Sequence, residues 1–122
     1  FYGGAGKEEL IELNRIRKLG VNLILATDNG SCGFKGFVTS AVEKFLSENR
    51  DEYRLYACGP PGMMKAIDAL ARENNISGEI SLEAPMPCGI GVCLGCIMPL
   101  RSGGNTRVCR EGPIYKIGEV IL

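Results

Sequence analysis

Four of the six cysteines in this chain follow a spacing that can hold a metal cluster. Cys88, Cys93 and Cys96 form a C-x4-C-x2-C pattern, and Cys109 follows after a gap of twelve residues. This is the plant-type spacing of a [2Fe–2S] cluster. Four cysteines can also hold structural zinc, but zinc sites favour paired C-x2-C knuckles, and the first gap here is four residues. The pattern favours an iron–sulfur cluster and leaves zinc, packing or disulfide use as alternatives.

The segment that carries the first three cysteines is rich in glycine, with Gly89, Gly91 and Gly95 between or beside them. Glycine accepts backbone angles that other residues avoid, so peptide N–H groups can approach cluster sulfurs closely. Such N–H···S contacts help to set the reduction potential of a cluster. We therefore expect one loop to wrap around the cluster and a separate strand to bring Cys109.

Cys58 stands at the end of a predicted strand and is followed by Gly59 and Pro60. Ligands of open α/β sheets bind at the carboxyl ends of parallel strands, and a helix that starts there offers N–H groups to an anion. A buried cysteine with a packing role is the alternative. We expect Cys58, Gly59 and Pro60 to face a ligand.

Three other features of the first 36 residues have an ordinary structural explanation beside a functional one. Asp28 is either a turn former or a polar contact to a ligand at a strand end. Cys32 is interpreted as a turn cysteine without a special role. The glycines of residues 1–6 lack the full G-x-G-x-x-G pattern, so a plain turn explains them as well as a dinucleotide site.

Composition excludes several functions. Lysine plus arginine equals aspartate plus glutamate, at 14 each, so nothing indicates nucleic acid or an anionic membrane as a partner. No apolar run reaches the roughly 18 residues of a membrane span. Histidine is absent, which removes the usual general base. Six cysteines without a secretory signal indicate metal or redox chemistry in a reducing compartment, and we expect a cytoplasmic protein.

Helices and strands alternate over the first 84 residues, as hydrophobic periodicity and glycine or proline stops indicate. We expect helices over residues 7–19, 37–46 and 60–71, and strands over residues 21–26, 53–58 and 79–83. Short links between such elements imply a parallel sheet with right-handed crossovers. The fold class is therefore α/β, with a partial doubly wound parallel sheet followed by a small β-rich [2Fe–2S] domain.

The character of the sequence changes after Ala84, where proline, glycine and cysteine become frequent. We place a domain boundary there, giving domains over residues 1–84 and 85–122. Short β-like pieces are expected over residues 97–100, 106–109 and 119–122. A module of about 38 residues is smaller than most domains that a hydrophobic core alone can stabilise, which again favours a metal centre.

Four segments resemble one known family. The stretch Tyr56–Met64 resembles the pyridine-nucleotide-binding domain of the ferredoxin reductase superfamily. The stretches Pro87–Cys96 and Arg107–Pro113 resemble the electron-transfer subunits of NAD-dependent dihydroorotate dehydrogenase, and Thr27–Gly36 resembles the Asp-Gly-Ser loop of that family. The likeness covers nearly the whole chain, and the cluster loop is its most specific part.

The resemblance implies an FAD-binding β-barrel, a nucleotide-binding domain and a C-terminal [2Fe–2S] domain. This chain matches the latter half of the second part and all of the third, so we expect a C-terminal fragment. In the intact subunit, electrons from an FMN-containing dihydroorotate dehydrogenase catalytic subunit reach FAD through the cluster and leave on NAD. Cys58, Gly59 and Pro60 are expected beside the nicotinamide. No residue of this chain is expected to act as a catalytic acid or base, and the chain alone is expected to be inactive.

Two alternatives remain open from the sequence. The chain is also similar to electron-transfer subunits of sulfide dehydrogenase or ferredoxin–NADP reductase type, some of which replace the first cluster cysteine with aspartate. Cys88 favours the dihydroorotate family. A zinc-stapled, non-catalytic interaction module is the alternative from a different class.

Overall fold

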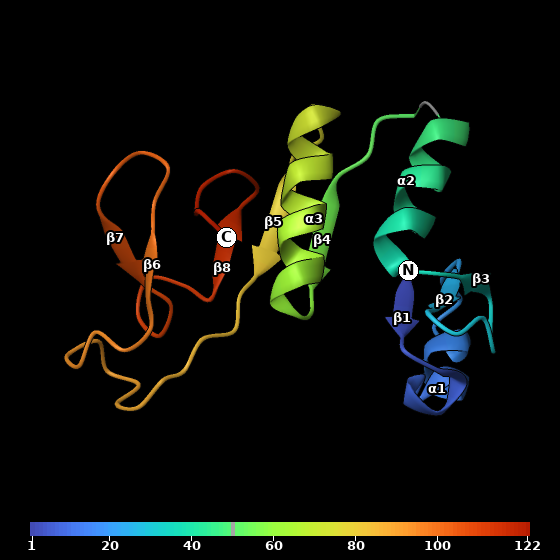
Figure 1. Ribbon diagram of the computed structural model, residues 1–122, viewed down its shortest axis with the longest axis horizontal. Coiled ribbons are helices and arrows are strands. Elements are labelled where there is room, and N and C mark those ends of the chain that lie inside the picture. The colour runs from blue at the N-terminus through green and yellow to red at the C-terminus, as the bar shows by residue number, and fades with distance from the viewer. Residues whose placement is uncertain (50) are drawn as a thin grey trace. The chain divides into compact units, whose positions relative to one another are not determined.

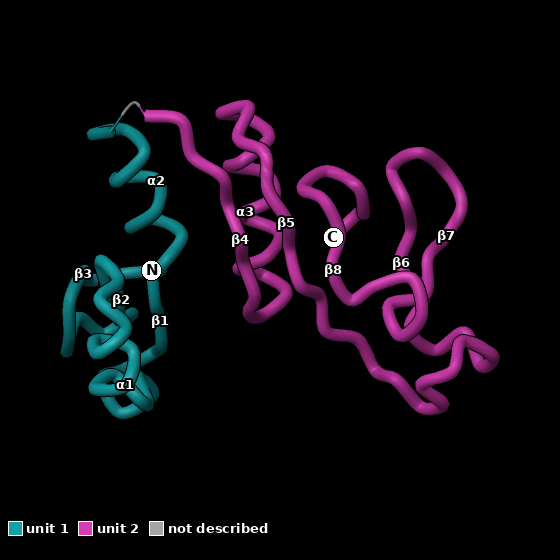
Figure 2. The backbone as a smooth tube through the Cα atoms, turned by 180° about the vertical axis from the view of Figure 1, so that it is seen from behind, with its two compact units in different colours: residues 1–50 teal, residues 51–122 magenta. Residues whose placement is uncertain are grey.

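A computed structural model describes residues 1–49 and 51–122 of the protein. The chain forms two compact units, residues 1–50 and residues 51–122 (Figures 1 and 2). No helix in the described part of the chain is long and apolar enough to cross a membrane.

The first unit contains a parallel three-stranded sheet in the order β1-β2-β3. Its strands are β1 (Tyr2–Gly4), β2 (Leu25–Thr27) and β3 (Phe34–Lys35). Helix α2 (Val38–Glu48) packs on β1 and β2 and buries Ala41 and Val42, which confirms the helix expected over residues 37–46. A 3-10 turn, η1 (Lys7–Glu9), and a short helix, α1 (Leu13–Lys18), connect β1 to β2.

Two expectations for this unit are wrong in detail. The helix expected over residues 7–19 is interrupted, because Glu12 adopts a left-handed backbone (φ 56°) between η1 and α1. The strand expected over residues 21–26 begins later, at Leu25. Strand β1 pairs with Leu25 to Thr27, and only the Ile24 carbonyl before them accepts a hydrogen bond from β1, from the Tyr2 N–H at 2.9 Å; Val21 stays exposed.

The second unit contains a mixed sheet in the order β4-β5-β8. Strands β4 (Leu55–Cys58) and β5 (Gly78–Ser81) are parallel, as expected, and β8 (Ile114–Lys116) adds antiparallel to β5. Helix α3 (Pro61–Glu73) starts with a proline in its first turn, packs on β4 and β5, and confirms the third expected helix. Gly78 permits the close strand pairing, because a Cβ there would collide with the Leu55 carbonyl.

A β-hairpin of β6 (Ile97–Pro99) and β7 (Asn105–Arg107) completes the second unit. It confirms the first two β-like pieces, whereas the strand expected over residues 119–122 is reduced to a single bridge between Val120 and Leu100. Strand β8 was not expected. The mixed α/β architecture with parallel strands agrees with the expected fold class.

One apolar core joins α3 and β5 to the hairpin region. Its buried members come from both sides of residue 84: Met64, Ile80, Leu82, Cys96, Val108, Tyr115 and Val120. The predicted boundary at residue 84 therefore lies inside a continuous core. The division into domains over residues 1–84 and 85–122 stays a prediction.

Candidate metal centre

The first two cluster cysteines, Cys88 and Cys93, form a pair within the loop between β5 and β6. Backbone N–H groups of Cys93 and Ile90, then the Cys93 thiol and the Val92 N–H, lower the pKa of Cys88 to about 6. The N–H of Gly95 donates to Cys93 Sγ at 3.4 Å. These amides stabilise negative charge on sulfur, which is the state in which cysteine binds iron.

Cys96 and Cys109 form the second pair. The backbone N–H and then the thiol of Cys109 lower the pKa of Cys96, while the hydrogen bond with Cys96 raises the pKa of Cys109. Cys96 is buried in the apolar core, and the N–H of Val108 donates to the Cys96 carbonyl at 3.2 Å. The backbone that carries Cys109 is thereby joined directly to the end of the loop.

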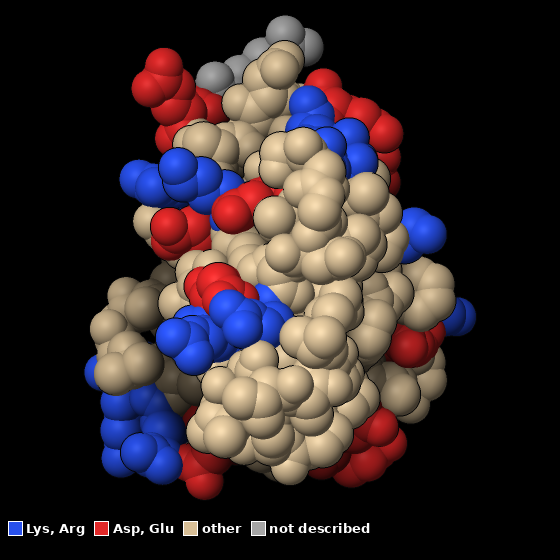
Figure 3. Space-filling model, turned by 90° about the vertical axis from the view of Figure 1, so that its left-hand side faces the viewer, with Lys and Arg blue, Asp and Glu red and all other residues tan. Residues whose placement is uncertain are grey.

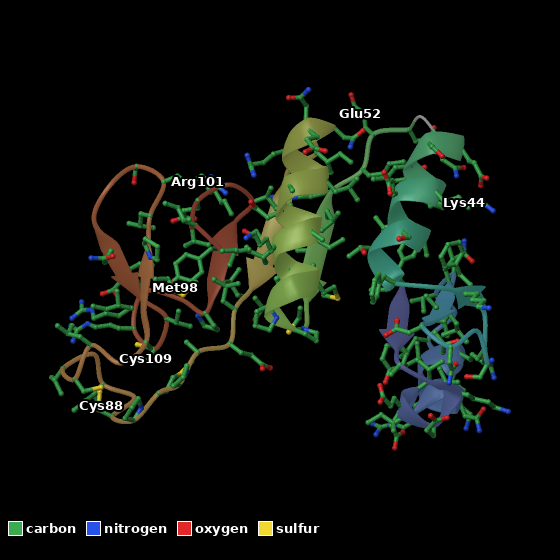
Figure 4. All side chains as sticks on the ribbon, viewed as in Figure 1. Lys44, Glu52, Cys88, Met98, Arg101 and Cys109 are labelled. Carbon is green, nitrogen blue, oxygen red and sulfur yellow. The ribbon has the colours of Figure 1, made fainter. Side chains whose placement is uncertain are left out.

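The two pairs lie near each other. The charge of Cys88 contributes to the raised pKa of Cys109, and Figure 4 shows Cys109 at the lower end of the β6–β7 hairpin with Cys88 on the loop below it. Within residues 1–49 and 51–122, no three Cys, Asp or Glu side chains meet closely enough to hold a single metal ion. Two thiolates per iron are what a [2Fe–2S] cluster requires, so the arrangement in pairs and the N–H donors fit that group.

The loop conformation depends on residues with positive φ. Gly89 and Gly91 have φ values of 66° and 82°, and Leu94 reaches 59°. Gly95 has another role, since a Cβ there would lie 3.0 Å from Pro87 Cδ and 3.5 Å from Cys93 Sγ. The glycines therefore let the loop fold tightly with its amides turned toward sulfur.

Arg107 and Glu111 adjoin the cysteines, although the sequence analysis assigned them no role. The guanidinium of Arg107 forms an ion pair with Glu111 and donates from Nη1 to the Gly91 carbonyl at 3.0 Å. The same ion pair lowers the pKa of Glu111 to about 2. Their i, i+4 spacing and opposite charges were the signal in the sequence, because this spacing also suits an ion pair across a tight turn.

Apolar side chains surround the cluster cysteines. Ile90, Val92 and Leu94 alternate with the cysteines and glycines of the loop and are 64%, 70% and 55% exposed. Figure 3 faces the side of the molecule that carries β6 and β7, and it shows a broad uncharged surface in the lower centre with charged side chains along its edges. Clustered exposed apolar residues of this kind mark interaction sites.

The predicted nucleotide contacts lie in both units. In the second, Cys58 is exposed at the carboxyl end of β4, and Pro60 precedes α3 without a side-chain cap. Gly59 leaves room beside Met63, whose side chain a Cβ would meet. In the first unit, Asp28 is exposed after β2, and its N–H donates to the Gly4 carbonyl at 3.1 Å.

Cys32 belongs to the turn after β2 and lies apart from the cluster segment in the sequence. The Thr27 hydroxyl donates to the Cys32 carbonyl at 2.8 Å and accepts the Cys32 N–H at 3.0 Å. The backbone of Cys32 thus closes the turn. This contact agrees with a structural role and involves no sulfur chemistry.

Two family models match the chain. Residues 5–69 match the oxidoreductase NAD-binding domain, and residues 83–121 match the iron–sulfur cluster binding domain of dihydroorotate dehydrogenase B. The second match contains all four cysteines of the predicted cluster motif.

Curated relatives carry the same two domains in a longer chain. The dihydroorotate dehydrogenase B electron transfer subunit homolog of Aquifex aeolicus is 40% identical over 99% of this chain and 46% of that protein. The electron transfer subunit of Caldanaerobacter subterraneus is 39% identical over 95% of this chain and 47% of that protein. The chain spans about half the length of these relatives.

A solved structure of the NADH-dependent reduced ferredoxin–NADP oxidoreductase, described for flavin-based electron bifurcation, has the same fold. It superimposes with a TM-score of 0.83 at 34% identity and covers 98% of this chain and 42% of that chain. The expected ferredoxin-reductase-like fold followed by an iron–sulfur domain is confirmed.

Proposed function

Because the chain belongs to the oxidoreductase NAD-binding domain family and has an iron–sulfur cluster binding domain of the dihydroorotate dehydrogenase B type, we propose that it belongs to an electron-transfer subunit. Cys88, Cys93, Cys96 and Cys109 hold a [2Fe–2S] cluster in this proposal. The observation that carries it is the arrangement of these cysteines as two pairs, each within reach of backbone N–H donors.

The subunit serves dihydroorotate oxidation in pyrimidine biosynthesis. A bound [2Fe–2S] cluster supplies one-electron transfer between the FMN of a catalytic partner and an FAD that passes electrons to NAD. The residues of this chain hold and orient the cluster. The amides of Ile90, Val92 and Cys93 face Cys88, and the amide of Gly95 faces Cys93, so that backbone N–H groups stabilise negative charge on these sulfurs.

The apolar surface formed by Ile90, Val92 and Leu94 is the docking face for the FMN-containing partner. These side chains are exposed around the cysteines. A partner that covers them would exclude water from the cluster and bring its flavin close to it. We place the complex in the cytoplasm, where free thiols stay reduced.

The turn Cys58–Gly59–Pro60 is the nicotinamide contact in this proposal. It joins the carboxyl end of β4 to the N-terminus of α3, where ligands of parallel sheets bind. Gly59 and the exposed Cys58 leave space for a flat ring. Asp28, at the end of β2, is a polar contact to the same class of ligand.

A second candidate is a subunit of ferredoxin–NADP reductase type, which the superimposed oxidoreductase structure favours. The two candidates differ in the partner that supplies electrons. Mixing the intact subunit anaerobically with an FMN-dependent dihydroorotate dehydrogenase catalytic subunit distinguishes them. Dihydroorotate should then bleach the visible absorption of the cluster and reduce NAD. Bleaching by reduced ferredoxin, with no response to dihydroorotate, would favour the second candidate.

A further inference from the structure

We propose that Arg107 is a positioning residue of the cluster, because its guanidinium joins the loop that carries Cys88 and Cys93 to the turn that carries Cys109. The inference rests on the proposed cluster site and adds to it two residues outside the cysteine motif, Arg107 and Glu111.

Glu111 holds the Arg107 side chain in place through several hydrogen bonds. Its Nε lies 3.1 Å from both carboxylate oxygens of Glu111, and its Nη2 also pairs with Glu111. The backbone N–H of Arg107 donates to Glu111 Oε2 at 2.8 Å. Several bonds between two residues leave the guanidinium little freedom, and such forked geometry is specific to arginine.

The same two residues close the turn that presents Cys109. The Arg107 carbonyl accepts the N–H of Arg110 at 3.0 Å and the N–H of Glu111 at 2.9 Å. Cys109 lies between the two ends of this turn. The Arg107–Glu111 ion pair therefore stabilises the backbone that delivers the fourth thiolate.

The remaining guanidinium nitrogen, Nη1, contacts the loop that carries Cys88 and Cys93. Nη1 of Arg107 donates to the Gly91 carbonyl at 3.0 Å. Gly91 has φ 82°, and a Cβ there would lie 3.0 Å from Arg110 Cδ and 3.4 Å from Arg107 Nη1. The N–H of Gly91 points to Cys109 Sγ and lowers the pKa of that thiol, against stronger causes that raise it. Gly91 is thus held at its carbonyl by Arg107, while its own N–H, in the preceding peptide unit, faces the sulfur of Cys109.

Position and charge can be separated with three variants. Arg107→Gln removes both the positive charge and the paired hydrogen bonds to Glu111. Arg107→Lys keeps the charge but loses the paired hydrogen bonds. Arg110→Gln is the matched control, since Arg110 also adjoins Gly91 but its side chain forms no hydrogen bond within residues 1–49 and 51–122. The wild-type chain and the variants are purified anaerobically with iron in place. The rate of cluster loss to a chelator and the EPR spectrum of the reduced cluster are then measured.

We expect both Arg107 variants to lose the cluster about tenfold faster than wild type, with shifted EPR g-values, because outer-shell partners of metal ligands contribute on this scale. The rate of cluster loss from Arg110→Gln should stay within about twofold of the wild-type rate. An Arg107→Lys chain that matches wild type in both measurements overturns the proposal, as does an Arg110→Gln chain as impaired as Arg107→Gln.

If Arg107→Gln takes up no iron, Glu111→Gln decides the question. The Glu111→Gln variant keeps the charge of Arg107 and weakens only the paired hydrogen bonds between residues 107 and 111. We therefore expect this variant to lose its cluster several times faster than wild type. A Glu111→Gln chain as stable as wild type overturns the proposal. A wild-type chain without iron would instead overturn the proposed function, so the two failures are distinguishable.

Discussion

The carboxylate of Asp68 accepts the backbone N–H of Gly118 at 2.6 Å, although the two residues are 50 positions apart in the sequence. Asp68 lies on α3, is 2% exposed, and also pairs with Arg72 at 3.0 Å and Arg101 at 3.2 Å. Arg101 follows the hairpin strand β6 and is labelled in Figure 4. The buried carboxylate of Asp68 therefore connects helix α3, which begins at the proposed nicotinamide turn, to Arg101 and Gly118 in the C-terminal part of the chain.

Replacing Asp68 by alanine should destabilise the second unit by about 3 kcal/mol, since the change leaves the half-buried Gly118 N–H and two arginines without their acceptor. Asp68→Asn should cost less, because one oxygen can still accept the Gly118 N–H. Urea unfolding measures both effects, with Glu73→Gln, an exposed acid on the same helix, as the control. An Asp68→Ala chain within about 0.5 kcal/mol of wild type would contradict the structural role.

The six cysteines provide their own controls for the cluster assignment. Cys96→Ser should reduce the iron content to well below two per chain, because an iron would lose one of its two thiolates. Cys32→Ser and Cys58→Ser should keep the iron, since neither cysteine belongs to the four-cysteine motif. Iron analysis and visible absorption measure the result. Equal iron loss in Cys32→Ser and Cys96→Ser would argue against this ligand set.

The cluster-free chain should show unequal thiol reactivity. The pKa of Cys88 is lowered to about 6 by the N–H groups around it, whereas the pKa of Cys109 is raised by its bond with Cys96. At pH 7 the Cys88 thiol is therefore mostly ionised, and thiolate is the reactive form. Alkylation followed by mass spectrometry should label Cys88 first, with a rate that rises through a midpoint near pH 6. A midpoint above about pH 8, close to an unperturbed thiol, would contradict this expectation.

Gly59 provides a test of the nicotinamide turn that leaves the cluster intact. A Cβ at this position would meet the Met63 side chain and narrow the space beside Cys58. In the intact subunit, Gly59→Val should weaken NAD binding by about tenfold, as a modest steric clash does. Iron content should not change. NADH titration measures the effect. An unchanged affinity for NADH would contradict the assignment of this turn to the nucleotide site.

The local features of this chain were predictable from its sequence. Helices α2 and α3 and strands β4 to β6 lie close to where periodicity and proline placement put them, and the cysteine spacing points to one compact segment. These signals depend on residues near one another in the chain. The break at Glu12 was not predictable, because a left-handed residue inside an apolar periodic stretch leaves no pattern.

The contacts between distant segments could not be predicted. Strand β8 forms because β5 offers it an edge, and the short Ile114–Lys116 segment has no strong strand pattern of its own. In the sequence, Asp68 looks like any acidic residue on a helix surface, and only the tertiary fold brings the Gly118 N–H to its carboxylate. The hydrogen bond from Arg107 to Gly91 likewise joins two segments 16 residues apart.

The most direct test of the central claim is EPR spectroscopy of the anaerobically purified chain, combined with iron and zinc analysis. We predict two irons per chain, broad visible absorption that reduction bleaches, and a rhombic EPR signal in the reduced state. Stoichiometric zinc in a colourless, EPR-silent protein would contradict the electron-transfer account and leave a structural zinc module in its place.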